Sequence, residues 1–162
     1  MKAKDIMVSD VPTVTRKTPV VDALRILNEN YGDASFINAA PGLIVVNDQG
    51  ELVGILSPLS IITALLENAP ASDRPQRITD DYFSSLCDKL RDRLVEDVME
   101  RQAISVTGEA LITDVADLFV KHRFQRIPVI KGKKVIGIIY RSRILFAMTK
   151  NLLQDSSIDK NQ

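Results

Sequence analysis

Cysteine and histidine are nearly absent from this sequence. Its 162 residues include one cysteine, Cys87, and one histidine, His122. A single cysteine cannot form an internal disulfide, so the chain suits a reducing compartment and we expect a cytoplasmic location. These two residues supply no Cys/His catalytic pair, and no cluster of residues has metal-ligand spacing. We therefore predict no catalytic residues and no metal site.

Net charge and long apolar runs are lacking as well. The 21 basic and 21 acidic residues cancel, so the chain lacks the overall positive charge of a non-specific nucleic-acid binder. No apolar run is long enough to span a membrane, and residues 1–5 lead into no apolar signal core. Neither a Gly-x-x-x-x-Gly-Lys loop nor a Gly-x-Gly-x-x-Gly motif occurs. The sequence thus predicts a non-enzymatic protein with no nucleic-acid and no membrane partner.

What the sequence does contain is an internal repeat. Asp-Ile-Met at residues 5–7 recurs as Asp-Val-Met at residues 97–99, an offset of 92. Leu-Val-Gly-Ile-Leu at residues 52–56 recurs as Val-Ile-Gly-Ile-Ile at residues 135–139, an offset of 83. The first copy therefore carries 9 extra residues, which we place within residues 31–41. A unit repeated twice predicts a pseudo-symmetric pair with a ligand cleft between the copies.

Both copies show the same order of strand, helix, strand, strand, helix. In the first copy we expect these elements at residues 11–15, 18–30, 43–46, 52–56 and 57–66. In the second copy we expect them at residues 103–106, 109–122, 127–130, 135–139 and 141–148. This order predicts an α/β fold of the mixed α+β type. The extra residues form either a loop or an additional turn of helix, and a tolerated surface insertion is favoured over a specific lid.

An amphipathic helix is expected between the copies, at residues 79–94. Thr79 suits its N-cap, and Asp80 and Asp81 suit the positive end of the helix dipole. Helical spacing gives it one apolar stripe, formed by Phe83, Leu86, Cys87, Leu90 and Leu94. Packing of the stripe on its own module is favoured over a partner surface. The predicted domains are the first repeat at 1–68, the linker with this helix at 69–93, the second repeat at 94–150 and a polar tail at 151–162.

With these motifs the chain resembles a tandem cystathionine-β-synthase (CBS) domain pair, or Bateman module. The resemblance covers about residues 4–66 and 94–150 and rests on the two Asp-apolar-Met segments, on Arg-Ile-Pro-Val-Ile at residues 126–130, and on Gly-apolar-apolar before each second helix. It implies two pseudo-symmetric units, a homodimer and a regulatory role toward an effector protein. The ligands that it implies are AMP, ADP, ATP or S-adenosylmethionine, with no cofactor required.

The resemblance also implies a ligand motif, Gly-apolar-apolar-Thr/Ser-x-x-Asp. In the first copy Ser57 matches the hydroxyl position, and Ser60 stands where the ribose-binding aspartate is expected. In the second copy Tyr140 replaces the hydroxyl residue and Arg143 replaces the aspartate. Neither copy keeps the carboxylate.

The candidate ligand-binding residues are Ser57, Ser60, Tyr140, Arg141, Arg143 and Arg126. Ser57 is explained by helix capping, with a ligand contact as an added role. Arg141 and Arg143 put positive charge at the positive end of a helix dipole, which an anion there would balance. The alternative is that both arginines point to solvent or pair with carboxylates. Arg126, which precedes the Pro128 strand, is a weaker candidate that we expect to face the cleft.

Two functions fit these patterns. The first is a stand-alone regulatory module that senses an adenine nucleotide or a related adenosyl or anionic ligand in the cleft between the repeats. The second is a ligand-free dimerisation or docking module for a partner protein. The arginines of the second copy favour the first function, and the missing aspartates favour the second.

Overall fold

The computed structural model describes residues 1–38, 42–77 and 79–154. Contacts within the chain form two compact units. The discontinuous unit joins Met1–Val11 to Ile104–Gln162, and the continuous unit runs from Pro12 to Ala103. Each unit therefore combines most of one sequence repeat with the opening segment of the other repeat.

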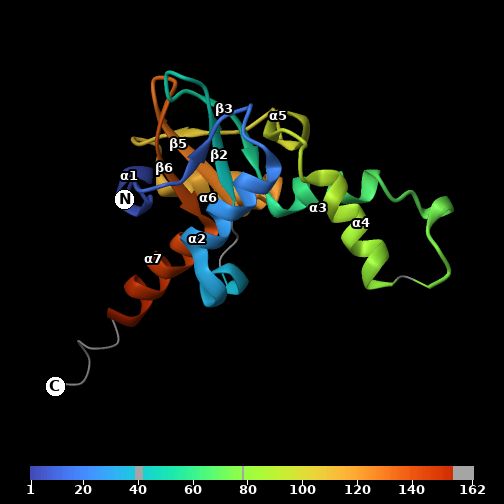
Figure 1. Ribbon diagram of the computed structural model, residues 1–162. Helices are drawn as coiled ribbons and strands as arrows, with labels where there is room; N and C mark the ends of the chain where they lie inside the picture. The colour runs from blue at the N-terminus through green and yellow to red at the C-terminus, as the bar shows by residue number, and fades with distance from the viewer. Residues whose placement is uncertain (39–41, 78, 155–162) are drawn as a thin grey trace. The chain divides into compact units, whose positions relative to one another are not determined.

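The continuous unit is built on a three-stranded sheet with the order β1-β2-β3, in which Figure 1 labels β2 and β3. Strand β1 is parallel to β2, and β2 is antiparallel to β3. The elements of this unit are β1 (Thr13–Val14), α2 (Val20–Asn38), β2 (Leu43–Val46), β3 (Leu52–Leu56), α3 (Pro58–Glu67), the 3-10 helix η1 (Ala71–Asp73), α4 (Asp80–Leu90) and α5 (Val95–Val98).

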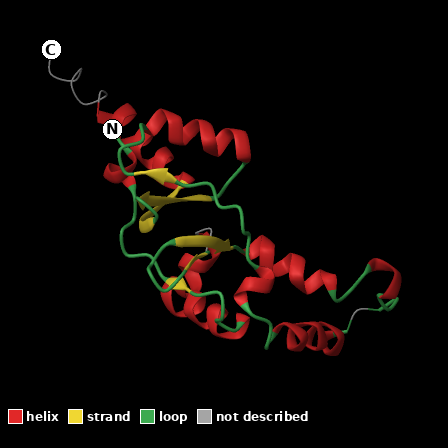
Figure 2. Cartoon of the chain, turned by 90° about the horizontal axis from the view of Figure 1, so that it is seen from above, coloured by secondary structure: helices red, strands yellow, loops and turns green. Residues whose placement is uncertain are grey.

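The discontinuous unit repeats this plan with the sheet order β4-β5-β6. Strand β4 is parallel to β5, and β5 is antiparallel to β6. Its elements are α1 (Ala3–Ile6), β4 (Val106–Thr107), α6 (Ile112–His122), β5 (Arg126–Lys131), β6 (Lys134–Tyr140) and α7 (Arg141–Gln154). The predicted mixed α/β fold of two similar units with a linker helix is confirmed, and Figure 2 shows strands and helices in both units.

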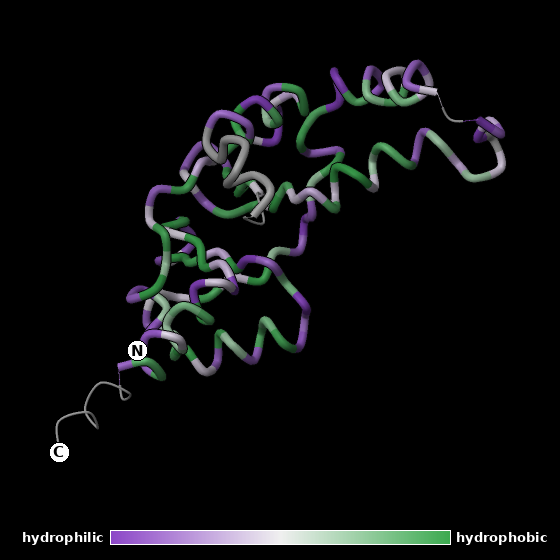
Figure 3. The backbone as a smooth tube through the Cα atoms, turned by 90° about the horizontal axis from the view of Figure 1, so that it is seen from below, coloured by the Kyte–Doolittle hydropathy of each residue, from purple (hydrophilic) through white to green (hydrophobic). Residues whose placement is uncertain are grey.

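Short apolar runs form the central strands because both faces of each sheet are covered. Leu43, Ile44 and Val45 are consecutive residues of β2, and all three are fully buried. Side chains of successive strand residues point to opposite faces, so burial of all three requires cover on both sides. Helices carry their apolar residues on one side, and their hydropathy accordingly alternates along the tube in Figure 3.

Several element boundaries differ from the predictions. Residues 30–32, with Gly32, were expected to end the first helix, but α2 continues to Asn38. Part of the inserted segment is thus helical, the second of the two predicted alternatives, and residues 39–41 lie outside the described residues. Helix α7 runs past the expected end at Met148 to Gln154, and the rest of the predicted tail, 155–162, is not described. Helix α4 ends at Leu90, short of the expected Leu94.

The opening segments of the two copies are placed in equivalent ways. The backbone N–H of Ala3 donates to the carbonyl of Ala110 (2.8 Å), and that of Val95 donates to Thr18 (2.8 Å). Both pairs fit the sequence offset of 92. Each segment begins with a single helical turn, α1 or α5, which the sequence did not predict. The sequence repeat is therefore also a repeat of backbone hydrogen bonds.

A charged cluster attaches the N-terminal segment to the discontinuous unit and makes this attachment dependent on pH. The ammonium groups of Lys2 and Lys4 both pair with the Glu109 carboxylate. Hydrogen bonds from Lys2 and then Lys4 lower the pKa of Glu109 from 4.5 to about 2. The hydrogen bond to Glu109 raises the pKa of Lys4 in turn. Because the pKa of Glu109 is lower in the folded state, the pairing stabilises the fold fully above pH ~4.5 and this contribution is lost as the pH falls through about 2.

We expect Glu109→Gln to reduce the loss of thermal stability that accompanies a fall in pH. The measurement is the thermal unfolding midpoint between pH of about 6 and 2, at low salt and at about 1 M salt, where exposed pairs are screened. Glu29→Gln, which removes an exposed carboxylate of α2, is the matched control. An unchanged acid limb in Glu109→Gln would show that the cluster does not contribute.

Candidate functional site

The candidate residues of the first copy meet at the N-terminus of α3. Ser57 is its N-cap, and its Oγ accepts a hydrogen bond from the Ser60 N–H (3.1 Å). The Ser60 Oγ accepts one from the Ser57 N–H (3.0 Å), so the two serines form a reciprocal capping box. Pro58 occupies the first helical position, where no N–H is needed. The predicted cap is confirmed, and a ligand contact by Ser57 stays a prediction.

A residue that was not among the candidates completes this cluster. The Ser57 Oγ donates a hydrogen bond to the Glu100 Oε1 (2.8 Å). Glu100 is held there by its backbone, which exchanges two hydrogen bonds with Ile55 at the end of β3 (2.8 and 3.0 Å). Glu100 belongs to the opening segment of the second copy, 43 residues away from Ser57. No local motif marks this residue, and the repeat offset relates it to Val8 without placing it near Ser57.

A cavity of about 260 Å³ lies beside this cluster, between α3 and α5. It contains three carboxylates, and one of them, that of Glu67, pairs with Arg93 (3.4 Å). A negatively charged lining disfavours a phosphate group. The residues that line the cavity are Leu59, Ser60, Thr63, Ala64, Glu67, Asp97, Val98 and Glu100.

The candidates of the second copy lie where β6 passes into α7. Tyr140 ends β6 and is half-buried, and Arg141 and Arg143 lie exposed in the first turn of α7. The Arg143 Nε donates a hydrogen bond to the carbonyl of Ile6 (3.1 Å), at the C-terminus of α1. The acceptor is a backbone carbonyl and not a carboxylate, and a contact of the exposed arginines with an anion stays a prediction. The first turn of α7 contains no acidic residue.

Arg126 and Tyr140 are brought together by the register of β5 and β6, in which they are direct partners. Arg126 is 7% exposed, although it is charged. The Arg141 N–H donates to the carbonyl of Gln125 (3.2 Å), the residue that precedes β5, so a backbone donor at the start of α7 is satisfied next to Arg126. The structure therefore gathers Arg126, Tyr140 and Arg141 at one end of the β5–β6 hairpin.

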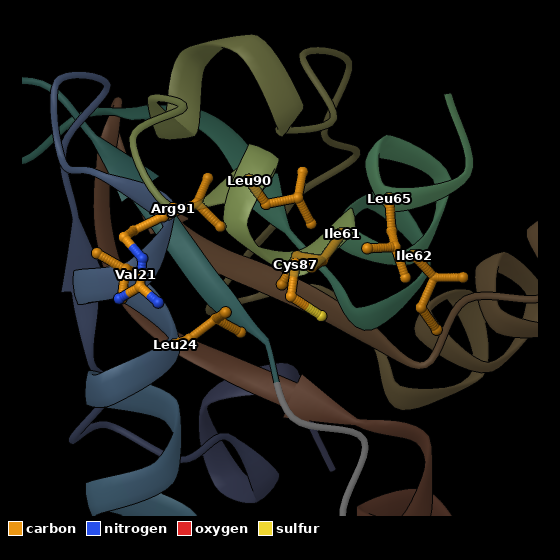
Figure 4. A pocket seen from close by; sticks show the side chains of 9 residues that line it. Val21, Leu24, Ile61, Ile62, Leu65, Cys87, Leu90 and Arg91 are labelled. Carbon is orange, nitrogen blue, oxygen red and sulfur yellow. The ribbon is translucent and has the colours of Figure 1, made fainter. Parts of the chain in front are cut away.

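A second cavity, of about 270 Å³, lies under α4 in the continuous unit (Figure 4). The predicted stripe of α4 is only partly buried: Leu86 and Leu90 are covered, whereas Phe83 and Cys87 are exposed. Helix α4 packs against α3, as the favoured prediction had it. Apart from Arg91 and Cys87 the lining is aliphatic, and consists of Val20, Val21, Leu24, Ile61, Ile62, Leu65 and Leu90.

Neither a metal-ligand cluster nor a membrane-spanning helix occurs in the part of the chain that the structure describes. In residues 1–38, 42–77 and 79–154, no group of three or more His, Cys, Asp or Glu side chains is placed to hold a metal ion. None of the helices in this part of the chain has the length and hydropathy to cross a membrane.

Comparison with known proteins gives consistent matches. The profile of the CBS domain matches residues 3–67 and residues 95–150. Protein MJ1426 of Methanocaldococcus jannaschii is 28% identical over 163 residues, which cover 91% of this chain and 91% of that protein.

Solved structures agree with the sequence matches. CBSX2, a CBS-pair protein from Arabidopsis thaliana, superimposes with a TM-score of 0.71 and 26% identity, over 92% of this chain and 94% of that chain. A structure of CBSX2 in complex with AMP superimposes with a TM-score of 0.66 and 25% identity, over 92% of this chain and 96% of that chain. The CBS domain pair of MJ0100 superimposes with a TM-score of 0.68 and 21% identity, over 93% of this chain and 98% of that chain. That structure is a complex with 5'-methylthioadenosine and S-adenosyl-L-methionine.

Proposed function

This chain belongs to the CBS domain family, and from that membership we propose that it is a regulatory module that binds an adenine nucleotide or a related adenosyl ligand. The AMP complex of CBSX2 supports an adenine ligand. The proposal assigns no catalysis to the chain. Its output is a change in the populations of two conformations, which a ligand produces only if it binds one conformation more tightly.

The observation that carries the proposal is the charge at the start of α7. Arg141 and Arg143 bring two guanidinium groups to a helix N-terminus, where the partial positive charge of the dipole already disfavours cations. A phosphate group would balance both arginines, and guanidinium groups bind phosphate through paired N–H donors. We propose that Arg143 and Arg141 bind the phosphate, with Tyr140 and Arg126 beside them.

Calorimetric titration of the purified protein with AMP, ADP, ATP and S-adenosylmethionine tests this proposal. We expect saturable AMP binding that weakens by about tenfold or more in Arg141→Ala and in Arg143→Ala, since a charged hydrogen bond to phosphate is worth about 1.5–3 kcal/mol. Arg25→Ala is the matched control, because Arg25 is an exposed arginine of α2 paired with Asp22. Thermal unfolding checks that loss of the contact from Arg143 to Ile6 leaves the protein folded.

Unchanged affinity in both arginine variants would overturn the proposed phosphate site. Absence of heat with every ligand, in protein shown to be free of bound nucleotide, would favour the second function, a docking or dimerisation module. A specific observation supports that alternative, because α7 exposes large apolar side chains in the described structure. These are Leu145, Phe146, Met148, Leu152 and Leu153.

A homodimer that also contacts an effector protein is part of the proposal. Exposed apolar residues on one helix face suit burial against a second protein surface. Light scattering of the purified protein measures the oligomeric state directly, with and without AMP.

A further inference from the structure

The two copies place different charges at structurally equivalent positions. Glu100 exchanges two backbone hydrogen bonds with Ile55, and Val8 exchanges two with Ile138 (2.8 and 2.9 Å). These pairs fit the sequence offsets of 92 and 83, so Val8 is the counterpart of Glu100. The second copy thus has an uncharged residue where the first copy has a carboxylate.

The two copies also differ in charge along the second helix of each copy. The offset of 83 matches hydroxyl or acidic residues of the first copy with aromatic or basic residues of the second. The matched pairs are Ser57 with Tyr140, Ser60 with Arg143 and Glu67 with Lys150. These exchanges make the second helix of the first copy more negative than that of the second copy, whereas the aspartates of the two opening segments, Asp97 and Asp5, are equivalent.

Glu100 occupies the place that an anion would take at the N-terminus of α3. Its Oε1 accepts the hydrogen bond from the Ser57 hydroxyl, and the same carboxylate lines the cavity of about 260 Å³ together with Asp97. The Ser57 Oγ is already the acceptor for the Ser60 N–H. An incoming phosphate would have to displace Glu100 and would lie close to a second carboxylate, and like charges at short range repel.

From this arrangement we infer that the Glu100 carboxylate prevents anionic ligands from binding at the first copy, so that each chain binds one nucleotide phosphate and not two. The inference rests on the proposed function for the site at α7. It adds that the two repeats have separate ligand specificities: the second accepts an anion, and the first admits at most a neutral or cationic group.

The test compares Glu100→Gln with the wild type by calorimetric titration with AMP and with adenosine, its uncharged analogue. Glutamine retains an oxygen that can accept the hydrogen bond from Ser57, so the fold is preserved while the charge is removed. We expect one equivalent of AMP per wild-type chain and two per Glu100→Gln chain, with the first-copy affinity for AMP raised by about tenfold or more. Adenosine binding is expected to change much less, because it carries no phosphate.

Two further variants separate the inference from the proposed function. Glu29→Gln makes the same change of net charge on exposed α2 and should still bind one equivalent. Glu100→Gln combined with Arg143→Ala should keep only the newly opened first-copy site. One AMP equivalent in wild type and in Glu100→Gln overturns the inference and leaves the proposed function standing. No AMP in wild type but one equivalent in Glu100→Gln supports the role of Glu100 and overturns the site at α7, whereas no binding in either protein overturns both.

Discussion

Gly54→Ala is expected to destabilise the protein by about 3 kcal/mol, a large part of the stability of an ordinary domain. A Cβ atom at Gly54 would lie 2.7 Å from the carbonyl oxygen of Glu100 and 2.8 Å from the Sδ of Met99. The methionine side chain can move, but the carbonyl is fixed by its hydrogen bond from Ile55. Relief of the clash would therefore break the bridge between β3 and the segment that follows α5, and overpacking is added to a lost hydrogen bond.

The chain provides matched comparisons for this prediction. Gly137 is the counterpart of Gly54, and a Cβ there would lie 2.9 Å from the carbonyl of Val8, so Gly137→Ala should lose a similar amount. Gly108→Ala is the control, because its Cβ would come no closer than 3.4 Å to Lys4. Urea unfolding of the three variants measures the differences. A loss below about 1 kcal/mol in Gly54→Ala would show that the two segments adjust at little cost.

Removal of residues 1–11 is expected to unfold the discontinuous unit. This segment buries Ala3 and Ile6 completely or nearly so, and both belong to the apolar core of that unit. It also makes backbone hydrogen bonds to Gly108, Ala110 and Ile138. Loss of one large buried side chain alone costs about 2–5 kcal/mol, and deletion removes its neighbours and these hydrogen bonds as well.

Amide hydrogen exchange resolved along the chain is the measurement for this deletion. We expect protection to fall in β6, which the segment contacts, and in β5, which pairs with β6, and to persist in β2 and β3 of the continuous unit. Replacement of the exposed residues Ser9 and Asp10 by alanine is the control, and it should leave protection unchanged. Equal protection of β5 in the deleted and intact proteins would mean that the second repeat folds without the segment.

Patterns confined to neighbouring residues were sufficient for most of the fold. The apolar runs at residues 43–46 and 52–56 predicted β2 and β3, because a short continuous apolar run is typical of a strand that is covered on both faces. Ser57 followed by Pro58 predicted the start of α3 because capping involves residues within one turn. The prediction that the first helix ends at residues 30–32 was wrong, because a potential left-handed stop does not end a helix when the following residues continue it.

Only part of the candidate site could be predicted from residues close together in the sequence. Ser57, Ser60, Tyr140 and Arg143 were found through the short motif that the family resemblance implies, and Arg141 through the positive charge at the start of a predicted helix. Glu100 was missed because its contact with Ser57 joins residues 43 positions apart, and no periodicity reports such a contact.

The sequence by itself determined the two-copy plan, the hairpins, the caps and the arginines at the start of α7, since each depends on residues close together in the chain. Only the tertiary structure decided which opening segment packs on which repeat, and hence that Glu100 reaches α3 while Val8 reaches β6. Both opening segments carry the same Asp-apolar-Met motif, so local preference cannot choose between them. The choice depends on packing and hydrogen bonds between segments about 40 to 140 residues apart in the chain, which form only when the units are assembled.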